Sequence, residues 1–402
     1  MTTIVGGTYF EQCMCPMWQE LFGSGGRAAT AIARLGGEAK LATYVDETSE
    51  AILRQRAALE GFTVEATTIE QSLHFRYTHG LANPSIRPAP KPALTLKVMD
   101  ACVIRFGMLE GDSVVTANCA VYDPQNPTNP VPFHANGSKA QRLALVLNRS
   151  EAEALHGSAD LNAATLARAL AKSQSAEIVI IKMGPAGALL YFQDQIHHIP
   201  SYITSRVWKV GSGDVFVATF AWFWADLALD PVDAAEKASR ATAYYCQTQG
   251  FVSEDELAVY RPVPAPLPKK SRTGRTPLVY LAGPFFSLAQ LWLIEEARGQ
   301  LLEMGLNVFS PVHDVGHGPA EDVVQKDLDA IHACDLMLAI GDGLDAGTIY
   351  EIGYARALKK PVVMYVENES EEDQKMMQGS DCILCDDFVT SIYRTVWKAA
   401  EL

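Results

Sequence analysis

Short hydrophobic runs alternate with longer segments of helical periodicity from residue 277 to the C-terminus. The runs lie at 278–282, 308–310, 336–340 and 361–366, and each has the length of a buried strand. Strands that alternate with helices predict a parallel sheet with helices on its faces.

The segment after the first of these strands contains a clear helix start. Ser287 and Gln290 have the spacing of a capping box, and Gly305 lies where the helix is expected to end. The intervening loop, Gly283-Pro284-Phe285-Phe286, therefore follows the carboxyl end of a strand. Open α/β sheets bind their ligands at that edge, so we expect Gly283, Pro284 and Phe285 to contact a substrate.

The first 260 residues also alternate between the two patterns. Residues 178–182 and 188–192 predict strands, and the glycine-containing segment 184–187 predicts the turn between them. A second glycine turn, at 211–213, precedes a hydrophobic segment that predicts a helix to about residue 225. The fold class predicted for the whole chain is therefore α/β.

Prolines separate these two halves. The stretch RPVPAPLPKKSRTGRT at 261–276 disfavours helix and is typical of an extended spacer. We expect domains at 1–261 and 277–402, with a proline-rich linker at 262–276. The basic residues of the linker, Lys269, Lys270, Arg272 and Arg275, are expected to be solvated rather than to bind nucleic acid.

Charge and composition narrow the classes of partner. The 402 residues carry a formal net charge of −14, which argues against a broad nucleic-acid-binding surface and favours small-molecule ligands. The sequence contains neither a signal peptide nor an apolar run long enough to cross a membrane, so we expect a cytoplasmic protein without a membrane partner. The eight cysteines are expected to be reduced and mostly buried.

Acidic residues surround the predicted strand at 336–340, and we expect several of them to converge on the ligand edge of the sheet. A helix that begins at Gly347-Thr348 would place Glu351 in its first turn, where exposed amides stabilise an anion. Such a carboxylate suits nucleophilic attack in glycosidic chemistry. Helix capping is the alternative role for these side chains. The acidic residues concerned are Asp327, Asp335, Asp342, Asp345 and Glu351.

Three ordered motifs of this half resemble the nucleoside 2-deoxyribosyltransferase family: YLAGPFF at 280–286, DLDAIHACD at 327–335 and DAGTIYEIGYARALKKP at 345–361. The resemblance implies a flavodoxin-like or Rossmann-like parallel-sheet domain without a cofactor. It also implies that Glu351 is the nucleophile and that Tyr280 orients it. Asp327 and Asp345 would hold the nucleobase and the sugar, and Asp327 would exchange a proton with the base.

The resemblance leaves the acceptor open between a second nucleobase and water. The apolar loop at 284–286 favours an unphosphorylated nucleoside over a nucleoside 5′-monophosphate. Members of the family commonly complete the site with residues of a neighbouring subunit, so a homo-oligomer is implied. Asn368 lies in a plausible region for such a contribution, although a surface loop explains it equally well.

The glycine turn at 211–213 could bind a phosphoryl group through its backbone amides, with Asp214 as the base that deprotonates a hydroxyl. The segments GSGGRAATAIARLGG at 23–37, NRSE at 148–151, KMGPAGALLY at 182–191 and GSGD at 211–214 together resemble the ribokinase-like (PfkB) carbohydrate kinases. The resemblance implies a ribokinase-like α/β sandwich that uses ATP and Mg²⁺. The implied phosphate-binding residues are Gly211, Ser212, Gly213, Asn148 and Glu151, with Glu151 on the magnesium, and the implied substrate-binding residues are Glu11, Gly25 and Gly26.

The acceptor side departs from the pattern of that family. Glu11 replaces an aspartate, Arg27 lies near a customary asparagine, and Trp208-Lys209 replaces an acidic and hydroxyl pair. The leading hypothesis is a bifunctional nucleoside-processing enzyme that transfers glycosyl groups and phosphorylates a sugar or nucleoside. Two alternatives remain: a kinase-like domain that is a non-catalytic sensor or scaffold, and a C-terminal domain that hydrolyses the 5′-phosphate product of the kinase.

Overall fold

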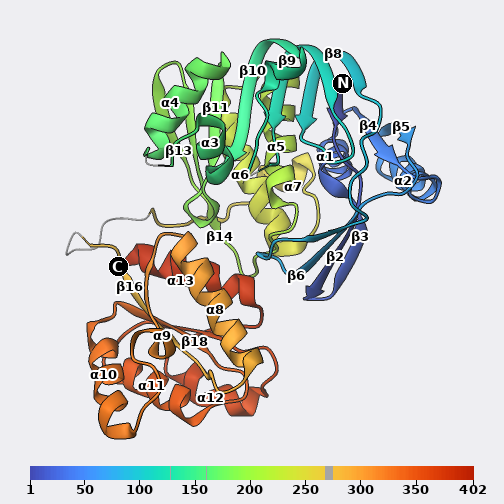
Figure 1. Ribbon diagram of the computed structural model, residues 1–402. Helices are drawn as coiled ribbons and strands as arrows, with labels where there is room; N and C mark the ends of the chain where they lie inside the picture. The colour runs from blue at the N-terminus through green and yellow to red at the C-terminus, as the bar shows by residue number, and fades with distance from the viewer. Residues whose placement is uncertain (127, 160, 268–274) are drawn as a thin grey trace. The chain divides into compact units, whose positions relative to one another are not determined.

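The computed structural model describes residues 1–126, 128–159, 161–267 and 275–402. The chain divides into two compact units (Figure 1). The N-terminal unit comprises Met1–Thr204 and Trp208–Pro264, and the C-terminal unit comprises Ser205–Val207 and Ala265–Leu402. Both are α/β, as the hydrophobic pattern predicts.

A nine-stranded sheet forms the centre of the N-terminal unit, in the order β13-β12-β11-β10-β9-β8-β1-β4-β5. Neighbouring strands from β5 to β11 pair in parallel. Strand β12 pairs antiparallel with β11, and β13 pairs antiparallel with β12. Their bounds are β1 Thr2–Val5, β4 Ala39–Val45, β5 Thr63–Thr68, β8 Leu96–Phe106, β9 Ser113–Asp123, β10 Lys139–Asn148, β11 Ile178–Lys182, β12 Ala188–Phe192 and β13 Gln195–Ile199. The predicted strands at 178–182 and 188–192 are confirmed.

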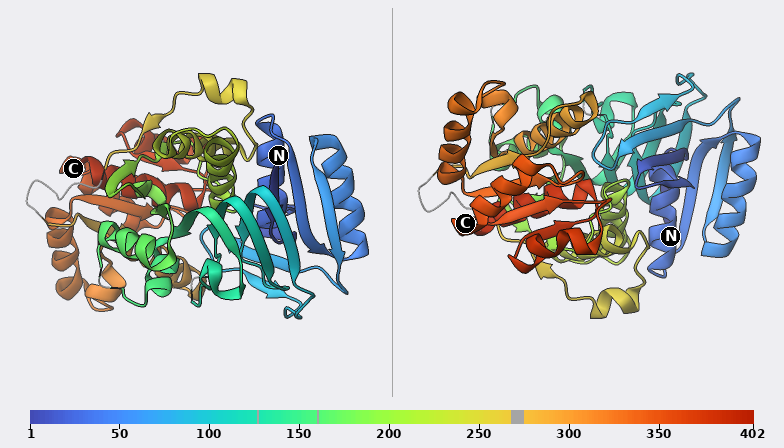
Figure 2. Two further views of the ribbon diagram at one scale, coloured as in Figure 1. Left: turned by 90° about the horizontal axis from the view of Figure 1, so that it is seen from above. Right: turned by 90° about the horizontal axis from the view of Figure 1, so that it is seen from below.

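Alternate residues of this sheet enter two hydrophobic cores, because successive side chains of a strand point to opposite faces. Ile4 and Ile180 lie in the core formed with helices α1 (Gly23–Arg34), α5 (Ser212–Ala221) and α6 (Pro231–Thr248). Val5 and Val179 lie in the core formed with α3 (Arg149–His156) and α4 (Ala163–Gln174). Helices therefore cover both faces of the sheet (Figures 1 and 2).

The helix predicted after the glycine turn is α5, which continues as a π-helical turn, η3, over Trp222–Asp226. The remaining helices of the unit are α2 (Glu47–Glu60) and α7 (Glu254–Val259), with the 3-10 turns η1 (Phe133–Asn136) and η2 (Gly184–Ala186). A second, four-stranded sheet has the order β3-β2-β6-β7, formed by β2 Phe10–Cys15, β3 Trp18–Leu21, β6 His74–His79 and β7 Ser85–Arg87.

The C-terminal unit contains a five-stranded, all-parallel sheet in the order β17-β16-β18-β19-β20. In chain order this is 2-1-3-4-5, the order of flavodoxin-like domains. The strands are β16 Leu278–Ala282, β17 Asn307–Phe309, β18 Leu336–Ile340, β19 Val362–Tyr365 and β20 Ile383–Cys385. The four predicted strands are confirmed to within a residue at each end, and β20 was not predicted.

Helices also cover both faces of this smaller sheet. Tyr280 and Met337 lie in the core with residues of α10 (Ala320–Ala333), α11 (Ala346–Ala357) and α12 (Glu371–Gly379). Helices α8 (Leu288–Glu303) and α13 (Phe388–Glu401) pack against each other, and α9 (Pro311–Asp314) follows β17. The predicted capping box of Ser287 and Gln290 is present at the start of α8.

The described part of the predicted linker includes a short strand. Its residues Val263–Pro264 form β15, which pairs with β14 (Tyr202–Ile203) of the N-terminal unit. Arg275 forms an ion pair of 2.9 Å with Asp335. Pro268, Lys269, Lys270 and Arg272 lie outside the described residues.

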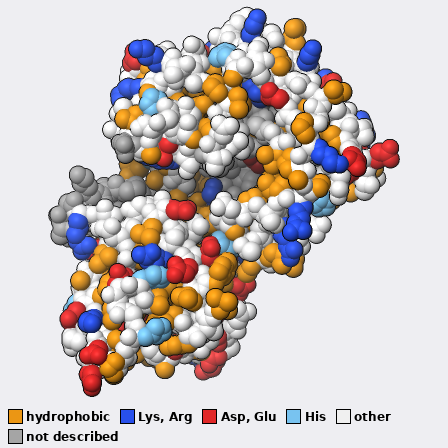
Figure 3. All heavy atoms as spheres, viewed as in Figure 1, with side chains coloured by type: hydrophobic (Ala, Val, Ile, Leu, Met, Phe, Trp, Pro, Cys, Tyr) orange, Lys and Arg blue, Asp and Glu red, His pale blue; other side chains and the backbone are white. Residues whose placement is uncertain are grey.

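The distribution of charged side chains on the surface is relevant to the expectation that the protein does not bind nucleic acid. On the face shown in Figure 3, the described Lys and Arg side chains are scattered among Asp and Glu side chains. No helix within the described ranges is long and apolar enough to span a membrane.

Candidate active sites

The loops that follow β16 and β18 meet at the carboxyl edge of the C-terminal sheet. The two strands are neighbours, but the chain leaves them in opposite directions, since β17 lies beyond β16 and β19 lies beyond β18. Such a switch in strand order opens a crevice at the carboxyl ends of the strands, which is the usual ligand site of this topology.

Tyr280 reaches the helices beside this edge because its side chain points to the face covered by α10 and α11. The ring is fully buried, and its hydroxyl donates a hydrogen bond of 2.6 Å to Glu351 Oε1. Burial and the Glu351 carboxylate raise the pKa of Tyr280 far above its usual range. The phenol therefore stays protonated and remains a donor that fixes the carboxylate.

Glu351 lies on α11 and is partly buried. Burial raises the pKa of Glu351 to about 7, although the hydrogen bond from Tyr280 lowers it, and the charges of Asp327 and Asp345 raise it further. The structure thus brings these four predicted residues together. Titration near neutrality leaves a large fraction of Glu351 ionised, as a nucleophile requires.

Asp327 approaches from α10. Burial raises the pKa of its carboxyl group, and nearby Lys326 lowers it. The Oδ1 atom of Asp327 is buried and accepts no hydrogen bond from the described residues. An unsatisfied buried oxygen is costly unless a ligand pairs with it, so this atom is a candidate contact for substrate.

Asp345 is the N-cap of α11, where its Oδ2 accepts hydrogen bonds from the backbone nitrogen of Thr348, at 2.9 Å, and from the Thr348 hydroxyl, at 3.1 Å. The helix therefore begins at Ala346, and Glu351 is its sixth residue. The expectation that Glu351 lies in the first turn is wrong, and its carboxylate is held by a side chain of the sheet instead of by free amides.

Asp327, Asp345 and Glu351 come together, as expected for several of the acidic residues, but Asp335 and Asp342 do not join them. Asp335 precedes β18 and accepts a hydrogen bond from the backbone nitrogen of Leu278, which places it at the amino edge of the sheet. Asp342 lies at the carboxyl edge and accepts hydrogen bonds from the backbone nitrogen atoms of Glu367 and Asn368. The Asn368 side chain also donates to Asp342, so this asparagine has a partner in its own chain.

The loop after β16 is compact. A Cβ atom at Gly283 would lie 2.7 Å from the side chain of Ile294, so the close packing here requires glycine. Pro284 is buried, and the ring of Phe285 lies 5.4 Å from the His317 ring, edge to face. Phe285 and His317 thus form an aromatic pair next to the loop after β16, and His317 was not predicted because it lies outside the recognised motifs.

A second polar cluster forms in the N-terminal unit, where β2 and α5 bring Glu11 and Asp214 to the same side chain. Arg27 donates to Glu11 Oε2 at 2.6 Å and to Asp214 Oδ2 at 2.7 Å. The backbone nitrogen of Gly23 also donates to Glu11. Burial raises the pKa of Glu11, Arg27 lowers it, and Asp214 raises it. Sequence reasoning singled out all three charged residues but not this contact.

The glycine turn precedes α5 and lies beside two lysines. Lys209 Nζ donates a hydrogen bond to the Ser212 hydroxyl at 2.9 Å. Burial lowers the pKa of Lys209, and the charge of Lys182 lowers it further. A Cβ atom at Gly213 would lie 3.5 Å from Lys182 Nζ. Backbone amides and two cations together are suited to a phosphate.

Asn148 and Glu151 form a capping box at the start of α3, with reciprocal hydrogen bonds of 2.8 Å. Burial raises the pKa of Asp123 to about 7. The charge of Glu151 also raises this pKa, and the charge of Lys182 lowers it. Asp123 Oδ1 has no hydrogen-bond partner among the described residues. Mg²⁺ takes oxygen ligands and often only one or two carboxylates, so Asp123 and Glu151 fit a magnesium ion held together with phosphates.

Gly25 and Gly26 have a packing role in α1. A Cβ atom at Gly25 would lie 2.7 Å from the carbonyl oxygen of Gly6, so glycine lets the helix approach β1 closely. Gly26 is less constrained, because its nearest neighbour is Thr8 Oγ1 at 3.9 Å.

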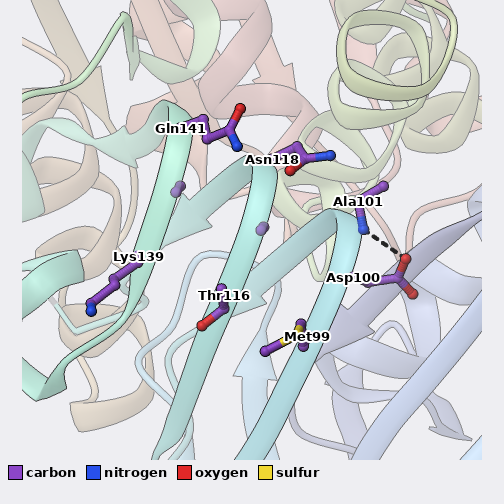
Figure 4. A pocket seen from close by; sticks show the side chains of 9 residues that line it. Met99, Asp100, Ala101, Thr116, Asn118, Lys139 and Gln141 are labelled. Atoms are coloured by element: carbon purple, nitrogen blue, oxygen red, sulfur yellow. Dashed lines mark hydrogen bonds between the residues drawn. The ribbon is translucent and has the colours of Figure 1, made fainter.

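One surface hollow lies apart from both clusters (Figure 4). It has a volume of about 410 Å³ and is lined by β8, β9 and β10, including Met99, Thr116 and Lys139. No crossover helix lies between β8 and β9 in the chain, because residues 107–112, which join these two parallel strands, contain no helix. Parallel strands usually have a helical crossover. None of the predicted site residues lines the hollow.

Comparison with known proteins finds a family match in each half of the chain. Residues 126–256 match the pfkB family of carbohydrate kinases, and residues 279–385 match the nucleoside 2-deoxyribosyltransferase family. The chain joins a pfkB-family domain to a nucleoside 2-deoxyribosyltransferase domain. Both families are enzymatic, and the predicted resemblances are confirmed.

Solved structures similar to the chain are ribokinase-family kinases. Ribokinase from Thermotoga maritima is 17% identical, with a TM-score of 0.49, over 65% of this chain and 98% of its own. Fructokinase from Vibrio cholerae O395, solved with fructose, ADP and calcium ion, is 14% identical, with a TM-score of 0.49, over 65% of this chain and 99% of its own. A search of the curated proteins finds no match.

Proposed function

We propose that the deoxyribosyltransferase domain cleaves the N-glycosidic bond of a nucleoside and transfers the ribosyl or deoxyribosyl group to a second nucleobase. The observation that carries this proposal is the hydrogen bond from buried Tyr280 to Glu351 at the switch point of the sheet. It fixes a carboxylate of near-neutral pKa where a bound sugar would present its anomeric carbon.

In the first step, Glu351 forms a bond to the anomeric carbon while the bond from that carbon to the base nitrogen breaks. The electron pair goes to the leaving base, which takes a proton. Asp327 is the proposed donor, because burial raises its pKa and its Oδ1 atom is unpaired among the described residues. A nitrogen of the incoming base then attacks the same carbon, releases Glu351 and returns the proton to Asp327.

Asp345 would contact the sugar. Its hydrogen bonds with Thr348 fix the carboxylate at the start of α11, on the same helix as Glu351. The Phe285–His317 pair, next to Gly283 and Pro284, offers the base an aromatic surface.

An unphosphorylated nucleoside is the proposed substrate. The charge of Asp345, which acts on Glu351, would repel a 5′-phosphate. The alternatives are a hydrolase, in which water replaces the second base, and a nucleoside 5′-monophosphate N-glycosidase.

A homo-oligomer in the cytoplasm remains part of the proposal. The side chains of Phe286 and Leu288, beside the substrate loop, are 72% and 83% exposed, which suits a neighbouring subunit. Light scattering on the purified protein tests this part separately.

The family of the N-terminal domain makes phosphotransfer from ATP the second candidate activity, with Mg²⁺ held by Glu151 and Asp123. It requires that an acceptor hydroxyl reach Asp214. The contact between Arg27 and Asp214 favours the non-catalytic alternative instead. We therefore propose glycosyl transfer as the activity of the chain.

The test incubates the full chain with a panel of deoxynucleosides and ribonucleosides, an acceptor base and no ATP, and separates the products by chromatography. We expect exchanged nucleosides, and a loss of at least about 10³-fold in Glu351→Gln and Glu351→Ala. Glu303→Gln, on the exposed end of α8, is the matched control and should keep full activity. Equal turnover by the wild type and the Glu351 variants would refute the proposal, and release of free sugar would assign hydrolysis.

A further inference from the structure

Arg27 is fully enclosed in the N-terminal unit: its side chain is 0% exposed. The guanidinium donates through Nε to the Tyr245 hydroxyl at 3.1 Å, through Nη1 to Gly23 and Asp214, and through Nη2 to Glu11. Burial lowers the pKa of Arg27, but the charges of Glu11, Tyr245 and Asp214 raise it well above its usual range. Arg27 is therefore a permanent cation between two buried carboxylates.

Both oxygens of Asp214 are engaged. Oδ2 accepts from Arg27 at 2.7 Å, and Oδ1 accepts from Gln125 Nε2 at 2.8 Å. A general base needs an oxygen directed at the hydroxyl that it deprotonates, within hydrogen-bond reach. An acceptor would have to displace one of these two side chains to reach Asp214.

The guanidinium also lies directly against the glycine turn. A Cβ atom at Gly211 would lie 2.0 Å from Arg27 Nε and 2.1 Å from its Cζ. One side chain thus occupies the space between Glu11, on the expected substrate side, and Gly211, on the expected phosphate side. Glu11 already has two donors within the protein, since Gly23 and Arg27 both donate to its Oε2 atom.

The phosphate side keeps its basic residues. Lys209 bonds Ser212, and Lys182 pairs with Asp123 at 2.6 Å. The closure therefore concerns the acceptor half of the cluster.

We propose that Arg27 fills the acceptor pocket of the pfkB-family domain as a built-in cation, so that Asp214 is a structural partner of Arg27 and the domain transfers no phosphoryl group. The proposal does not depend on glycosyl transfer by the other domain. Displacing Arg27 would leave two buried carboxylates without their counter-charge, which makes the closed pocket the stable state.

Two measurements on the full chain test the proposal together. The first follows Mg²⁺-dependent ATP consumption with fructose, ribose and nucleosides as acceptors, in the wild type and in Asp214→Asn. The second compares the melting temperature, Tm, of Asp214→Asn and Glu11→Gln with that of the wild type. We expect no ATP consumption above the protein-free rate, and a drop in Tm of more than about 5 °C in each variant, because each leaves Arg27 short of a buried partner.

Glu50→Gln is the matched control, since Glu50 pairs with Arg54 on the surface and such pairs contribute little. Its Tm should change by less than about 2 °C. The triple variant Arg27→Met, Glu11→Gln, Asp214→Asn removes all three charges and should recover most of the Tm lost by Asp214→Asn, because no ion is then left unpaired. It also keeps the proposal testable where a single variant does not fold.

ATP consumption that requires Asp214 would overturn the proposal, whatever the Tm values. An unchanged or raised Tm in Asp214→Asn would overturn it as well, because a structural partner of Arg27 cannot be removed without loss. The expected pair of results, no transfer together with a Tm loss that the triple variant repairs, would establish it.

Discussion

The Tyr280 hydroxyl and the Glu351 carboxylate form a hydrogen bond of 2.6 Å between the first strand and the third main helix of the C-terminal sheet domain. The two residues are 71 positions apart in sequence. The bond opposes the effect of burial on Glu351 and leaves the carboxyl group with a pKa of about 7. Tyr280 therefore controls both the direction of the Glu351 carboxylate, the proposed nucleophile, and the fraction of it that is ionised at neutral pH.

Replacing Tyr280 with phenylalanine removes this bond. The pKa of Glu351 should then rise, because a hydrogen bond to the ionised form lowers the pKa. We expect the acid limb of the kcat/KM profile, near pH 7 in the wild type, to move up by about one to two pH units. Tyr354→Phe is the control, since the Tyr354 hydroxyl bonds His332 instead, and its profile should match the wild type. An unmoved acid limb in Tyr280→Phe would contradict the assignment.

The neighbouring carboxylate should act in the opposite direction. In the free enzyme the ionised carboxylate of Asp327 raises the pKa of Glu351, so Asp327→Asn should move the acid limb of kcat/KM to lower pH, by about one unit. The rate at the plateau should also fall, by roughly 10²-fold or more, because asparagine cannot serve as the proposed proton donor, a role that Asp327 takes once it is protonated in the substrate complex. Asp329→Asn changes an exposed aspartate on the same helix and should leave both quantities unchanged. Movement of the limb in the same direction as in Tyr280→Phe would exclude this electrostatic account.

Hydrophobic patterning placed four of the five strands of the C-terminal sheet, but only β11 and β12 of the nine-stranded N-terminal sheet. It predicted β16 and β18 at their observed bounds, because buried parallel strands are continuous apolar runs between turn signals. It missed β20, whose three residues are too few to form such a run. The positions of the acidic residues in the sequence did not show which of them reach the carboxyl edge, since acidic residues lie at both ends of β18. The two ends of a five-residue strand are about 16 Å apart, so Asp335 cannot join the residues at the carboxyl edge.

Long-range pairs account for what the sequence did not predict. The roles of Glu351 and Tyr280 came from family motifs and not from the spacing of charges. Arg27 was noticed only as a departure from a motif, although it joins Glu11, 16 residues away, to Asp214, 187 residues away. No local pattern encodes an ion pair of this kind, because its members meet only after the sheet and its helices have assembled.

Glu110 gives a test of stability in the pfkB-family domain. Its side chain is 2% exposed, burial raises its pKa to about 7, and neither oxygen has a partner among the described residues in good hydrogen-bond geometry. A carboxyl group with a raised pKa in the folded state stabilises the fold at low pH. That stability is lost as pH rises from about 4.5 through about 7, and the full loss is about 3 kcal/mol.

Glu110→Gln removes this titration. We expect the variant to be more stable than the wild type at pH 8, with the advantage shrinking toward pH 5. Thermal unfolding at both pH values measures the difference. Glu303→Gln, at an exposed position, should show no such dependence. An equal change in Tm at pH 5 and pH 8 would show that Glu110 is not buried as described.

The contact between Gly211 and Arg27 predicts that alanine at position 211 destabilises the fold more than alanine at another glycine with positive φ. Gly211 has a φ of +76°, and an added Cβ atom would lie 2.0 Å from Arg27 Nε. Gly157 has a φ of +81° with open space around its Cα, so alanine there suffers only the backbone strain, about 1 to 2 kcal/mol. Gly211→Ala carries the same strain together with a clash inside a buried ion cluster, which should cost at least about 2 kcal/mol more.

In an Arg27→Ser background the losses of unfolding free energy caused by the two alanine substitutions should become nearly equal, since the clashing atoms of Arg27 are gone. Denaturant unfolding of the four variants measures both differences, and a Gly211→Ala penalty that persists without Arg27 would place the guanidinium elsewhere than against the glycine turn.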